Sequence, residues 1–469
     1  MDSQKKLTFP LAVGLFIFML CIIISCLFLL HVEPHIPLFL SVVMLSAAAL
    51  WFGFPWKSIE KGIVDGIKNG VQPIIVLALI GILIGAWMYS GAIPTVTVYA
   101  LSFIEPSHLL LTALFSCMII STLVGSSLTT VSTIGVALIG VASAAGVPLE
   151  WTAGAVICGA CFGDKMSPMS DTTNFAAGIG EIPIFEHIRH MMGTTIPALL
   201  ITVVLFYFLG SSVSADAAST DNIQQVITGI KDAANVTPWA LLSPLLVVLL
   251  AMKRVSVIPV LTAGIISSGI LTAIFVPDSS LQAFMTALQN GTTFETDNEA
   301  AAKIINRGGL QSMMGSVSLI MIAFALGGLM EKIGLISALL EGVMKGIRSK
   351  GRLVAATVCS SIGVNLATGE QYLSILIPGQ SFKSLYDKRN IQRKFLTRSL
   401  EDGGTLINPL IPWGVSGAFM ASALGVPVID YIPFTFFLYI SPMISILIGF
   451  VKKEKEPRCK KRALFFVHL

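Results

Sequence analysis

Charged residues are scarce in this chain of 469 residues, in which Asp, Glu, Lys and Arg together make up only 12%. Hydrophobic residues make up 54%, and the mean hydropathy is +0.84. The surface of a soluble globular protein needs about a quarter of its residues charged. The shortage of charge therefore excludes a water-soluble globule and indicates a polytopic membrane protein surrounded by lipid.

Enzyme motifs are missing as well. The sequence has no Walker GxxxxGK(S/T) motif, no HExxH motif and no GxSxG motif in a plausible setting. No polar stretch is long enough to form a soluble catalytic domain, so we expect neither an enzyme nor a cofactor. The net charge of +4 comes from Lys and Arg in short loops and at the C-terminus, which argues against nucleic acid as a partner.

Metal and redox signals are weak. The seven cysteines lie mostly within apolar spans, where they behave as small hydrophobic residues. Cys158 and Cys161 have the CxxC spacing, but neither a second pair nor a His cluster accompanies them. This pattern favours close helix packing over metal or redox chemistry.

The apolar runs and the basic loops together predict a topology. Lys5 and Lys6 place the N-terminus in the cytoplasm, and the first run lacks the cleavage site of a signal peptide. Residues 56–69 form an amphipathic segment that we expect along the membrane interface. We predict ten full crossings, with both termini inside: 10–30, 36–54, 72–92, 151–180, 191–210, 238–252, 255–276, 310–330, 395–426 and 432–451.

Two further apolar regions are predicted to enter the membrane and leave on the same side. Residues 109–146 are interrupted at 125–130 and have no basic residue at either end, so their short arms predict a hairpin from outside. The region broken at 363–370 lies between two strongly basic clusters, which predicts a hairpin from inside. The polar tips of both hairpins would reach the middle of the membrane.

Broken helices and hairpins occur in the same order twice. Crossing 151–180 is expected to break around 163–168, and crossing 395–426 is interrupted by Glu-Asp-Gly-Gly and Asn-Pro. Gly163-Asp164 and Glu401-Asp402 are 238 positions apart, as are the two hairpin tips. The fold class predicted is an all-α polytopic membrane protein with two inverted repeats, the arrangement of many secondary transporters. A fold of twelve continuous helices is the alternative.

This pattern divides the chain into five segments. They are an N-terminal pair of helices with the interfacial helix (1–69), a first repeat (70–210), a linker with two crossings and external loops (211–308), a second repeat (309–451) and a basic cytoplasmic tail (452–469).

Asp164 and Asp171 are the strongest candidates for a functional site. An acidic side chain at mid-membrane costs roughly 2.5–3.5 kcal/mol, so two within eight positions indicate an ion or proton path. Two carboxylates in one poorly solvated site repel each other, which lets the site hold either a proton or a sodium ion. Alternatively, Asp164 pairs with Lys165 and only holds the break together.

Oxygen-bearing side chains around these aspartates are the expected sodium ligands, because a hard cation replaces its water shell with oxygens. From the first broken helix these are Ser167, Ser170, Thr172, Thr173 and Asn174. From the first hairpin they are Ser126, Ser127, Thr129 and Thr130, and from the second repeat Asn365, Thr368, Glu370, Asp402 and Asn408. Glu401 could face the same cavity or form a salt bridge with Arg398. His187 and His190 are either a pH sensor or, more simply, a solvated pair.

Three long segments resemble one family. They are GDKMSPMSDTTNFAAGIGEIPIFEHIRHM at 163–191, TGEQYLSILIPGQSF at 368–382 and EDGGTLINPLIPWGVSGAF at 401–419. They are similar to the NhaC family of sodium:proton antiporters, and the likeness extends over essentially the whole chain. The resemblance implies a bacterial inner-membrane antiporter that exports sodium in exchange for protons.

Other functions remain open from sequence. One branch of the family exchanges protons and malate for sodium and lactate, and its motifs look the same. Such an organic-anion exchanger needs a cation for the carboxylate, for which Lys165, the hairpin tips or helix N-termini could serve. A channel would need a continuous pore, whereas two opposed hairpins normally serve alternating access. Gly-rich faces could support a homodimer or pack the fold internally.

Overall fold

The computed structural model describes residues 7–30, 32–103, 106–212, 220–253, 255–277 and 279–451. These residues form helices and connecting turns, with no strand among them. Six helices are long and apolar enough to cross a membrane, or eight if each of two bent helix pairs counts as one span. The prediction of an all-helical multi-pass membrane protein is confirmed. The N-terminal lysines and the basic tail (452–469) lie outside the described residues.

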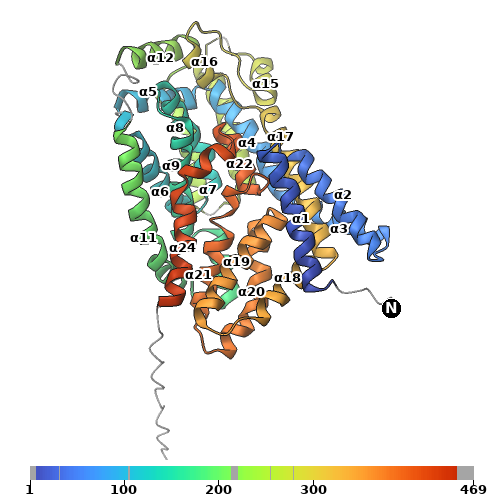
Figure 1. Ribbon diagram of the computed structural model, residues 1–469. Helices are drawn as coiled ribbons and strands as arrows, with labels where there is room; N and C mark the ends of the chain where they lie inside the picture. The colour runs from blue at the N-terminus through green and yellow to red at the C-terminus, as the bar shows by residue number, and fades with distance from the viewer. Residues whose placement is uncertain are drawn as a thin grey trace, which may run out of the picture.

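The chain order of the helices is visible in Figure 1. The first part contains α1 (Phe9–Phe28), α2 (His35–Trp51), α3 (Trp56–Asn69), α4 (Val71–Tyr89), α5 (Ala92–Phe103), α6 (Leu109–Val124), α7 (Ser127–Thr130), α8 (Val136–Ala144), α9 (Leu149–Met166), α10 (Asp171–Gly180) and α11 (Ile184–Ser211). The middle part contains α12 (Thr220–Ala233), α13 (Leu242–Met252), α14 (Val257–Phe275), α15 (Leu281–Asn290) and α16 (Glu299–Ile305). The last part contains α17 (Met314–Lys332), α18 (Leu335–Lys345), α19 (Lys350–Thr368), α20 (Gln371–Lys388), α21 (Arg393–Gly404), α22 (Val415–Leu424), α23 (Val428–Tyr431) and α24 (Phe436–Val451).

Several of these helices are absent from the prediction. The external loops expected at 211–236 and 277–309 contain α12, α15 and α16, which cover the upper end of the molecule (Figure 1). Each is shorter than a membrane span and buries apolar side chains, for example Val226, Ile227 and Ile230 of α12. Such helices are stabilised by tertiary packing, so their own hydropathy does not reveal them.

Glycine allows α9 to pack closely against α6. A side chain at Gly159 would lie 2.2 Å from the carbonyl oxygen of Leu114, and one at Gly163 would lie 2.5 Å from that of Met118. Cys158 and Cys161, also in α9, are free and buried. The CxxC spacing therefore coincides with a close helix contact, as expected for small residues at a helix interface.

The first broken helix breaks later than predicted. α9 continues through Gly163 and Asp164 to Met166, and the break comprises Ser167 to Ser170. Ser167 is extended because it precedes Pro168, and a residue before proline is disfavoured in the α region. α10 then begins at Asp171, so the two aspartates lie on either side of the break.

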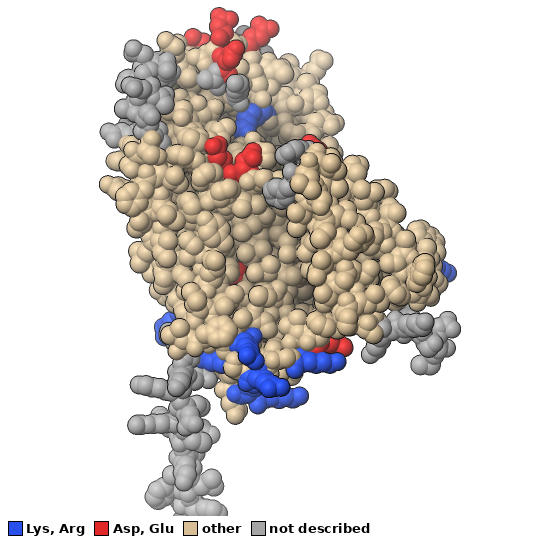
Figure 2. All heavy atoms as spheres, in the orientation of Figure 1, with Lys and Arg blue, Asp and Glu red and all other residues tan. Residues whose placement is uncertain are grey.

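Both predicted hairpins turn at a glycine in the left-handed conformation. α6 ends at Gly125 (φ 73°), and α19 ends at Gly369 (φ 66°). The second turn lies later than the start of the predicted break, because α19 continues through Asn365 and Thr368. Figure 2 shows that Lys and Arg gather at the lower end of this face of the molecule, and Asp and Glu mainly at the upper end.

Candidate functional site

A cavity of about 250 Å³ lies where the first break and both hairpin tips meet. Its polar lining comes from the junction of α3 and α4, the first hairpin tip with α7, the two sides of the first break and the start of α20: Asn69, Gln72, Ser126, Ser127, Thr129, Asp164, Asp171, Thr172, Glu370, Gln371 and Tyr372. A second hollow shares Gln72, Ser126 and Asp171 with it and extends to Val255 and Ser256, between α13 and α14.

Asp164 links the broken helix to the first hairpin by hydrogen bonds. Its Oδ2 accepts hydrogen bonds from the backbone N–H of Ser127 at 3.1 Å and from the Ser127 hydroxyl at 2.7 Å. Hydrogen bonds to a carboxylate are stronger than those between neutral groups. The alternative in which Asp164 pairs with Lys165 does not occur, because Lys165 is paired elsewhere. Asp164 thus lines the cavity without a basic partner among the described residues.

Asp171 occupies the first turn of α10 and is exposed to the cavity. The partial positive charge of a helix N-terminus stabilises a carboxylate there. Ser170 is the N-cap of this helix, with its hydroxyl accepting from the Thr173 N–H at 3.4 Å. The break therefore places one carboxylate at the end of α9 and another at the start of α10, both lining the same cavity.

The other predicted ligands of the first repeat divide into two groups. Ser126, Ser127, Thr129 and Thr172 line the cavity. The rest shape the break and the hairpin: Asn174 donates to the carbonyls of Pro168 and Ser170, the Ser167 hydroxyl accepts from the Met169 N–H, and the hydroxyls of Thr173 and Thr130 donate to the carbonyls of Lys165 and Ser126.

Of the residues predicted from the second repeat, only Glu370 lines the cavity. It is the N-cap of α20, and its Oε2 accepts from the Leu373 N–H at 2.7 Å. The expectation that Asn365, Thr368 and Asn408 face the same cavity is wrong. Thr368 donates to the Val364 carbonyl, and the two asparagines are bonded to each other.

These two asparagines connect the second hairpin to the second break. Asn408 donates to Asn365 Oδ1 at 2.7 Å and to the Gly369 carbonyl at 2.9 Å, and its own Oδ1 accepts from the Ser416 N–H at 2.7 Å. Asn365 donates to the Gly404 carbonyl at 2.5 Å. All the polar atoms of the two amides are thus used to satisfy the backbone where the helices are interrupted.

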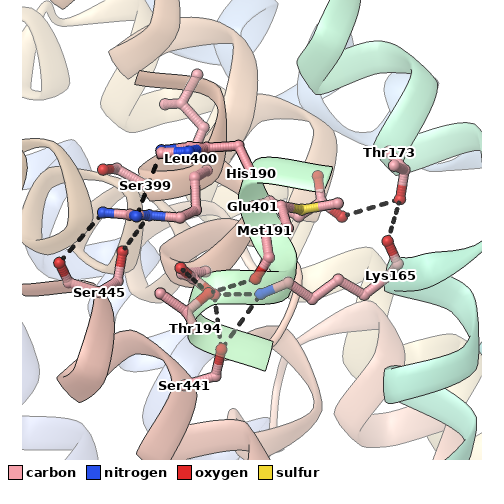
Figure 3. A network of polar contacts seen from close by, with 12 residues as sticks. Lys165, Thr173, His190, Met191, Thr194, Ser399, Leu400, Glu401, Ser441 and Ser445 are labelled. Carbon is pink, nitrogen blue, oxygen red and sulfur yellow. Dashed lines mark hydrogen bonds and ion pairs between the residues drawn. The ribbon is translucent and has the colours of Figure 1, made fainter. Parts of the chain in front are cut away.

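Asp402 is also predicted from sequence to face the cavity, but it does not line the cavity. It forms a fully buried ion pair with Lys165 of α9, and Ser441 of α24 donates to its Oδ1 at 2.8 Å. Lys165 reaches Ser441 at 3.3 Å, and Thr194 of α11 lies 3.4 Å from Asp402 Oδ2 (Figure 3). A buried pair needs such extra hydrogen bonds to offset desolvation. Lys165 and Asp402 therefore join the two predicted repeats.

Arg398 and the two histidines also differ from expectation. Arg398 donates to the Ser445 hydroxyl at 3.2 Å and lies 3.4 Å from His190 Nε2, and no ion pair joins it to Glu401 in the described part (Figure 3). His190 is half-buried, with its ring edge-to-face on Phe395. His187 is fully buried, so a solvated pair is wrong.

Four polar residues of the cavity lining were missed from sequence. Asn69, Gln72, Gln371 and Tyr372 line the cavity, but only their position in space identifies them. Asn69 and Gln72 stand at the junction of α3 and α4, where polar residues are ordinary. Gln371 directly follows Glu370 in a predicted hairpin tip, and from this position it could have been predicted as a cavity residue.

The cavity suits a small hard cation. Carboxylates, hydroxyls and amides line it, and none of its described lining residues is Lys, Arg or His. Hard cations take oxygen ligands. No group of three or more His, Cys, Asp or Glu side chains in the described ranges could hold a metal ion. The site thus offers oxygens for a cation and three carboxyl groups, those of Asp164, Asp171 and Glu370, that can take up protons.

Comparisons with known proteins agree with this chemistry. The sequence model of the Na+/H+ antiporter family matches residues 159–453. The Na+/H+ antiporter NhaC of Alkalihalophilus pseudofirmus is 51% identical over 449 residues, which cover 96% of each chain. The malate-2H+/Na+-lactate antiporter of Bacillus subtilis is 32% identical, with 96% of each chain covered. The arginine/ornithine antiporter ArcD of Halobacterium salinarum is 30% identical, covering 96% of this chain and 93% of that one.

The family match covers the first break and the whole predicted second repeat, and the likeness to NhaC extends over nearly the full length. The resemblance read from the three motifs is therefore confirmed: the chain belongs to the Na+/H+ antiporter family, within its NhaC group.

Proposed function

We propose that this protein is a secondary transporter that exports sodium in exchange for protons, with Asp164 and Asp171 as the coupling carboxylates. The observation that carries the proposal is that both aspartates line one cavity, at a helix break, without a basic lining residue among the described ones. Hydroxyls of Ser126, Ser127 and Thr172 supply further oxygens for the ion.

Exchange follows from competition for these carboxylates. Two carboxylates in a poorly solvated cavity repel each other, so the pair binds either a proton or a cation that relieves the repulsion. Sodium binding displaces the proton, and protonation displaces sodium. If the two bound forms are the ones that reorient across the membrane, the gradient of one ion drives the other.

Matched contacts support two inverted repeats. The Ser121 hydroxyl donates to the Ala160 carbonyl, and the Ser361 hydroxyl approaches the Leu400 carbonyl 240 positions later. Gly163 packs on the Met118 carbonyl as Gly403 packs on that of Val358, again 240 positions later. In this register, which exceeds the predicted one by two positions, Asp164 corresponds to Gly404. We retain repeats at 70–210 and 309–451, each with a re-entrant hairpin and a broken helix.

Charge distribution supports an orientation. The basic end of the molecule in Figure 2 carries the connections around α19, α20 and α21, which the positive-inside rule assigns to the cytoplasm. The hollow that continues the cavity reaches Ser256, beside Lys253 in the basic turn after α13. We therefore infer an inward-facing state in a bacterial inner membrane, with ten crossings and both termini in the cytoplasm.

An organic-anion exchanger is the second candidate, because the malate/lactate antiporter is a full-length relative. A dicarboxylate would need a cation in the cavity. Lys165, the basic residue considered for this role from sequence, is buried in an ion pair with Asp402. This observation favours a cation as the substrate over a carboxylate.

Reconstituted protein tests the proposal. In proteoliposomes with an imposed proton gradient, we expect added sodium to collapse the gradient, and neither malate nor lactate to be required. Asp171→Asn and Asp164→Asn should each abolish the sodium effect, because an amide cannot exchange a proton. Asp232→Asn, at an exposed aspartate of α12 far from the cavity in sequence and outside its lining, is the matched control.

A gradient that collapses without sodium, or that is unaffected by the cavity variants, would contradict the assignment. If the proton gradient collapses only when labelled malate or lactate is transported at the same time, the protein is the organic-anion exchanger and not the sodium:proton antiporter. Light scattering of the detergent-solubilised protein during size-exclusion chromatography tests for the homodimer that the Gly-rich faces allow.

A further inference from the structure

A second cavity, of about 260 Å³, shares no lining residue with the one that contains Asp164 and Asp171. Its lining comes mainly from the end of α15, the turn after α16, and parts of α4 and α22, toward the upper end of the molecule in Figure 1. Its polar lining residues are Asn290, Thr292, Asn306, Arg307, Ser312 and Ser422. Arg307 is the one charged residue of this described lining, so we name the space the Arg307 cavity.

Arg307 is held in a fixed position in this cavity. Its Nη2 donates to the carbonyl oxygen of Leu424, the last residue of α22, at 2.8 Å. A side chain at Gly425, the next residue, would lie 2.0 Å from the same nitrogen. The loop that carries Arg307 is itself fixed on α4, because the N–H of Gly309 donates to the Gly81 carbonyl at 2.9 Å. The guanidinium is thus placed before any ligand arrives.

The positive charge of Arg307 is only partly compensated. No acid of the described ranges forms an ion pair with it. The C-terminus of α22 offers the equivalent of roughly half a negative charge. The bond to Leu424 is the one hydrogen bond that Arg307 makes with described residues, so most of its five N–H donors remain available. The side chain is partly buried, and burial lowers its pKa. A buried cation without a counter-ion is costly, so this cavity favours a negative charge.

The neighbouring groups suit a small anion with a single charge. Asn290, at the end of α15, makes no side-chain hydrogen bond with any described residue, so its amide N–H groups are available to a ligand. One guanidinium matches one negative charge, whereas a divalent anion would leave a charge unmatched.

We propose that the Arg307 cavity binds a small monovalent inorganic anion, such as chloride, between Arg307 and Asn290. The guanidinium supplies the charge and several donors, and the amide supplies a further donor. The volume of the cavity leaves room for water molecules around the ion. This site does not depend on the proposed antiport.

An effect of the anion on sodium export does rest on the proposed function. The two cavities lie one helical turn apart along the same two helices: Ile80 and Ile84 of α4 and Phe419 and Ala423 of α22 line the first and the second cavity, respectively. In the proposed orientation, the Arg307 cavity is on the outer side. A bare guanidinium there repels a sodium ion that leaves outward, and a bound anion removes this repulsion. Sodium export should therefore be faster when the anion is present.

Thermal unfolding of the purified protein in detergent tests the site. Sodium gluconate is replaced stepwise by sodium chloride at constant sodium and ionic strength. We expect the Tm of wild type to rise with chloride and to level off, because a ligand of the folded state stabilises it by mass action. Arg307→Gln should lose this rise. Asn290→Asp should lose it too, because its carboxylate is an internal counter-ion, while Arg307 keeps its bond to Leu424.

The matched control is Arg389→Gln. Arg389 also donates to backbone carbonyls, those of Ile347 and Arg348, but lies outside the Arg307 cavity. This variant should keep the full chloride-dependent rise in Tm, which separates binding from a general salt effect. If Arg307→Gln does not fold, Asn290→Asp decides. A wild-type Tm that is the same in both salts, or an undiminished rise in Asn290→Asp, would overturn the proposal.

Transport measures the effect on sodium. In proteoliposomes with the membrane potential clamped by potassium and valinomycin, the initial rate of sodium-dependent proton movement is compared with chloride or gluconate on both sides. Wild type should exchange faster in chloride, and Asn290→Asp should exchange equally fast in both salts. Equal wild-type rates, despite chloride binding, would overturn the effect on sodium export. If wild type exchanges in neither salt, the proposed antiport fails, whereas the binding result is unaffected.

Discussion

Both breaks interrupt a helix, but the side chains around the two breaks differ. At the first break, Asp164 and Asp171 line the cavity, and hydroxyls surround them. At the second break, Gly404 lies 240 positions after Asp164, and its carbonyl accepts a hydrogen bond from Asn365. The side-chain amides of Asn365 and Asn408 hydrogen-bond to the backbone at this break, and neither amide brings a charge to the cavity. In the proposed mechanism, the first break binds the ion, whereas the hydrogen bonds at the second break stabilise its backbone.

Buried charge shows the same contrast. Of the acids in the predicted second repeat, Glu370 lines the cavity, whereas Glu401 and Asp402 are fully buried and Asp402 is paired with Lys165 of α9. A paired buried charge holds two elements in register, whereas a carboxylate beside a cavity can exchange its counter-ion. The difference teaches that acidic residues in equivalent motifs need not have equivalent roles. Their neighbours decide the role.

The strongest way to break this contrast is to remove one member of the buried pair. Asp402→Asn leaves Lys165 as an uncompensated charge, so we expect a loss of about 3–5 kcal/mol in the free energy of unfolding. Thermal unfolding in detergent measures it. The double variant Lys165→Met/Asp402→Leu should recover most of the loss, because it removes both charges. If Asp402→Asn were as stable as wild type but unable to exchange sodium, Asp402 would belong to the binding site after all.

A smaller effect is expected at the second break. Asn408→Ala leaves Asn365 Oδ1, the Gly369 carbonyl and the Ser416 N–H with fewer partners. Unsatisfied buried polar groups cost about 1–3 kcal/mol, so the unfolding transition should shift by that amount. The apparent sodium affinity of the remaining folded protein should stay close to wild type. A variant with normal stability and greatly weakened sodium binding would give the second break a binding role.

The smallest effect is expected at the exposed end of α10. Lys383 and Arg393 hold the pKa of Glu181 below its usual range by hydrogen bonds and charge. Because the pKa of Glu181 is lower in the folded state, its carboxylate stabilises the fold at pH values above the unfolded pKa of about 4.3. This stabilisation is lost as pH falls through the folded pKa.

Glu181→Gln should therefore unfold at a slightly lower temperature than wild type at neutral pH, with the difference vanishing in acid. Exposed ion pairs contribute little, so the shift is small. A large shift, or one that grows toward low pH, would mean that Glu181 does more than tie α10 to α20 and α21.

Much of the fold could be predicted because the membrane restricts the options. Apolar runs long enough to span lipid identify α1, α4, α11, α14 and α17, and basic loops predict their direction. The amphipathic segment 56–69 coincides with α3. The short helices α5, α12, α15, α16 and α18 escaped detection, because they depend on apolar stripes packed against other elements and not on overall hydropathy.

The candidate site was predictable in its first half and, in the predicted second repeat, at Glu370. Asp164 and Asp171 stand out from sequence because ionisable groups are rare in apolar spans. Asp402 stands out for the same reason, yet it does not line the cavity. Sequence spacing could not separate the two cases, because the motif spacing is 238 positions whereas the matched contacts of Ser121 and Ser361 lie 240 positions apart.

The amino-acid order alone determines that this protein is helical, crosses the membrane repeatedly, carries acidic groups at two interrupted helices and belongs with sodium:proton antiporters. These properties follow from local composition, since lipid requires apolar spans with satisfied backbones and tolerates few charges. Only the tertiary structure decided which acids meet water and which meet Lys165. That choice depends on which helices pack together, because the field at a buried carboxyl is set by residues hundreds of positions away in the chain.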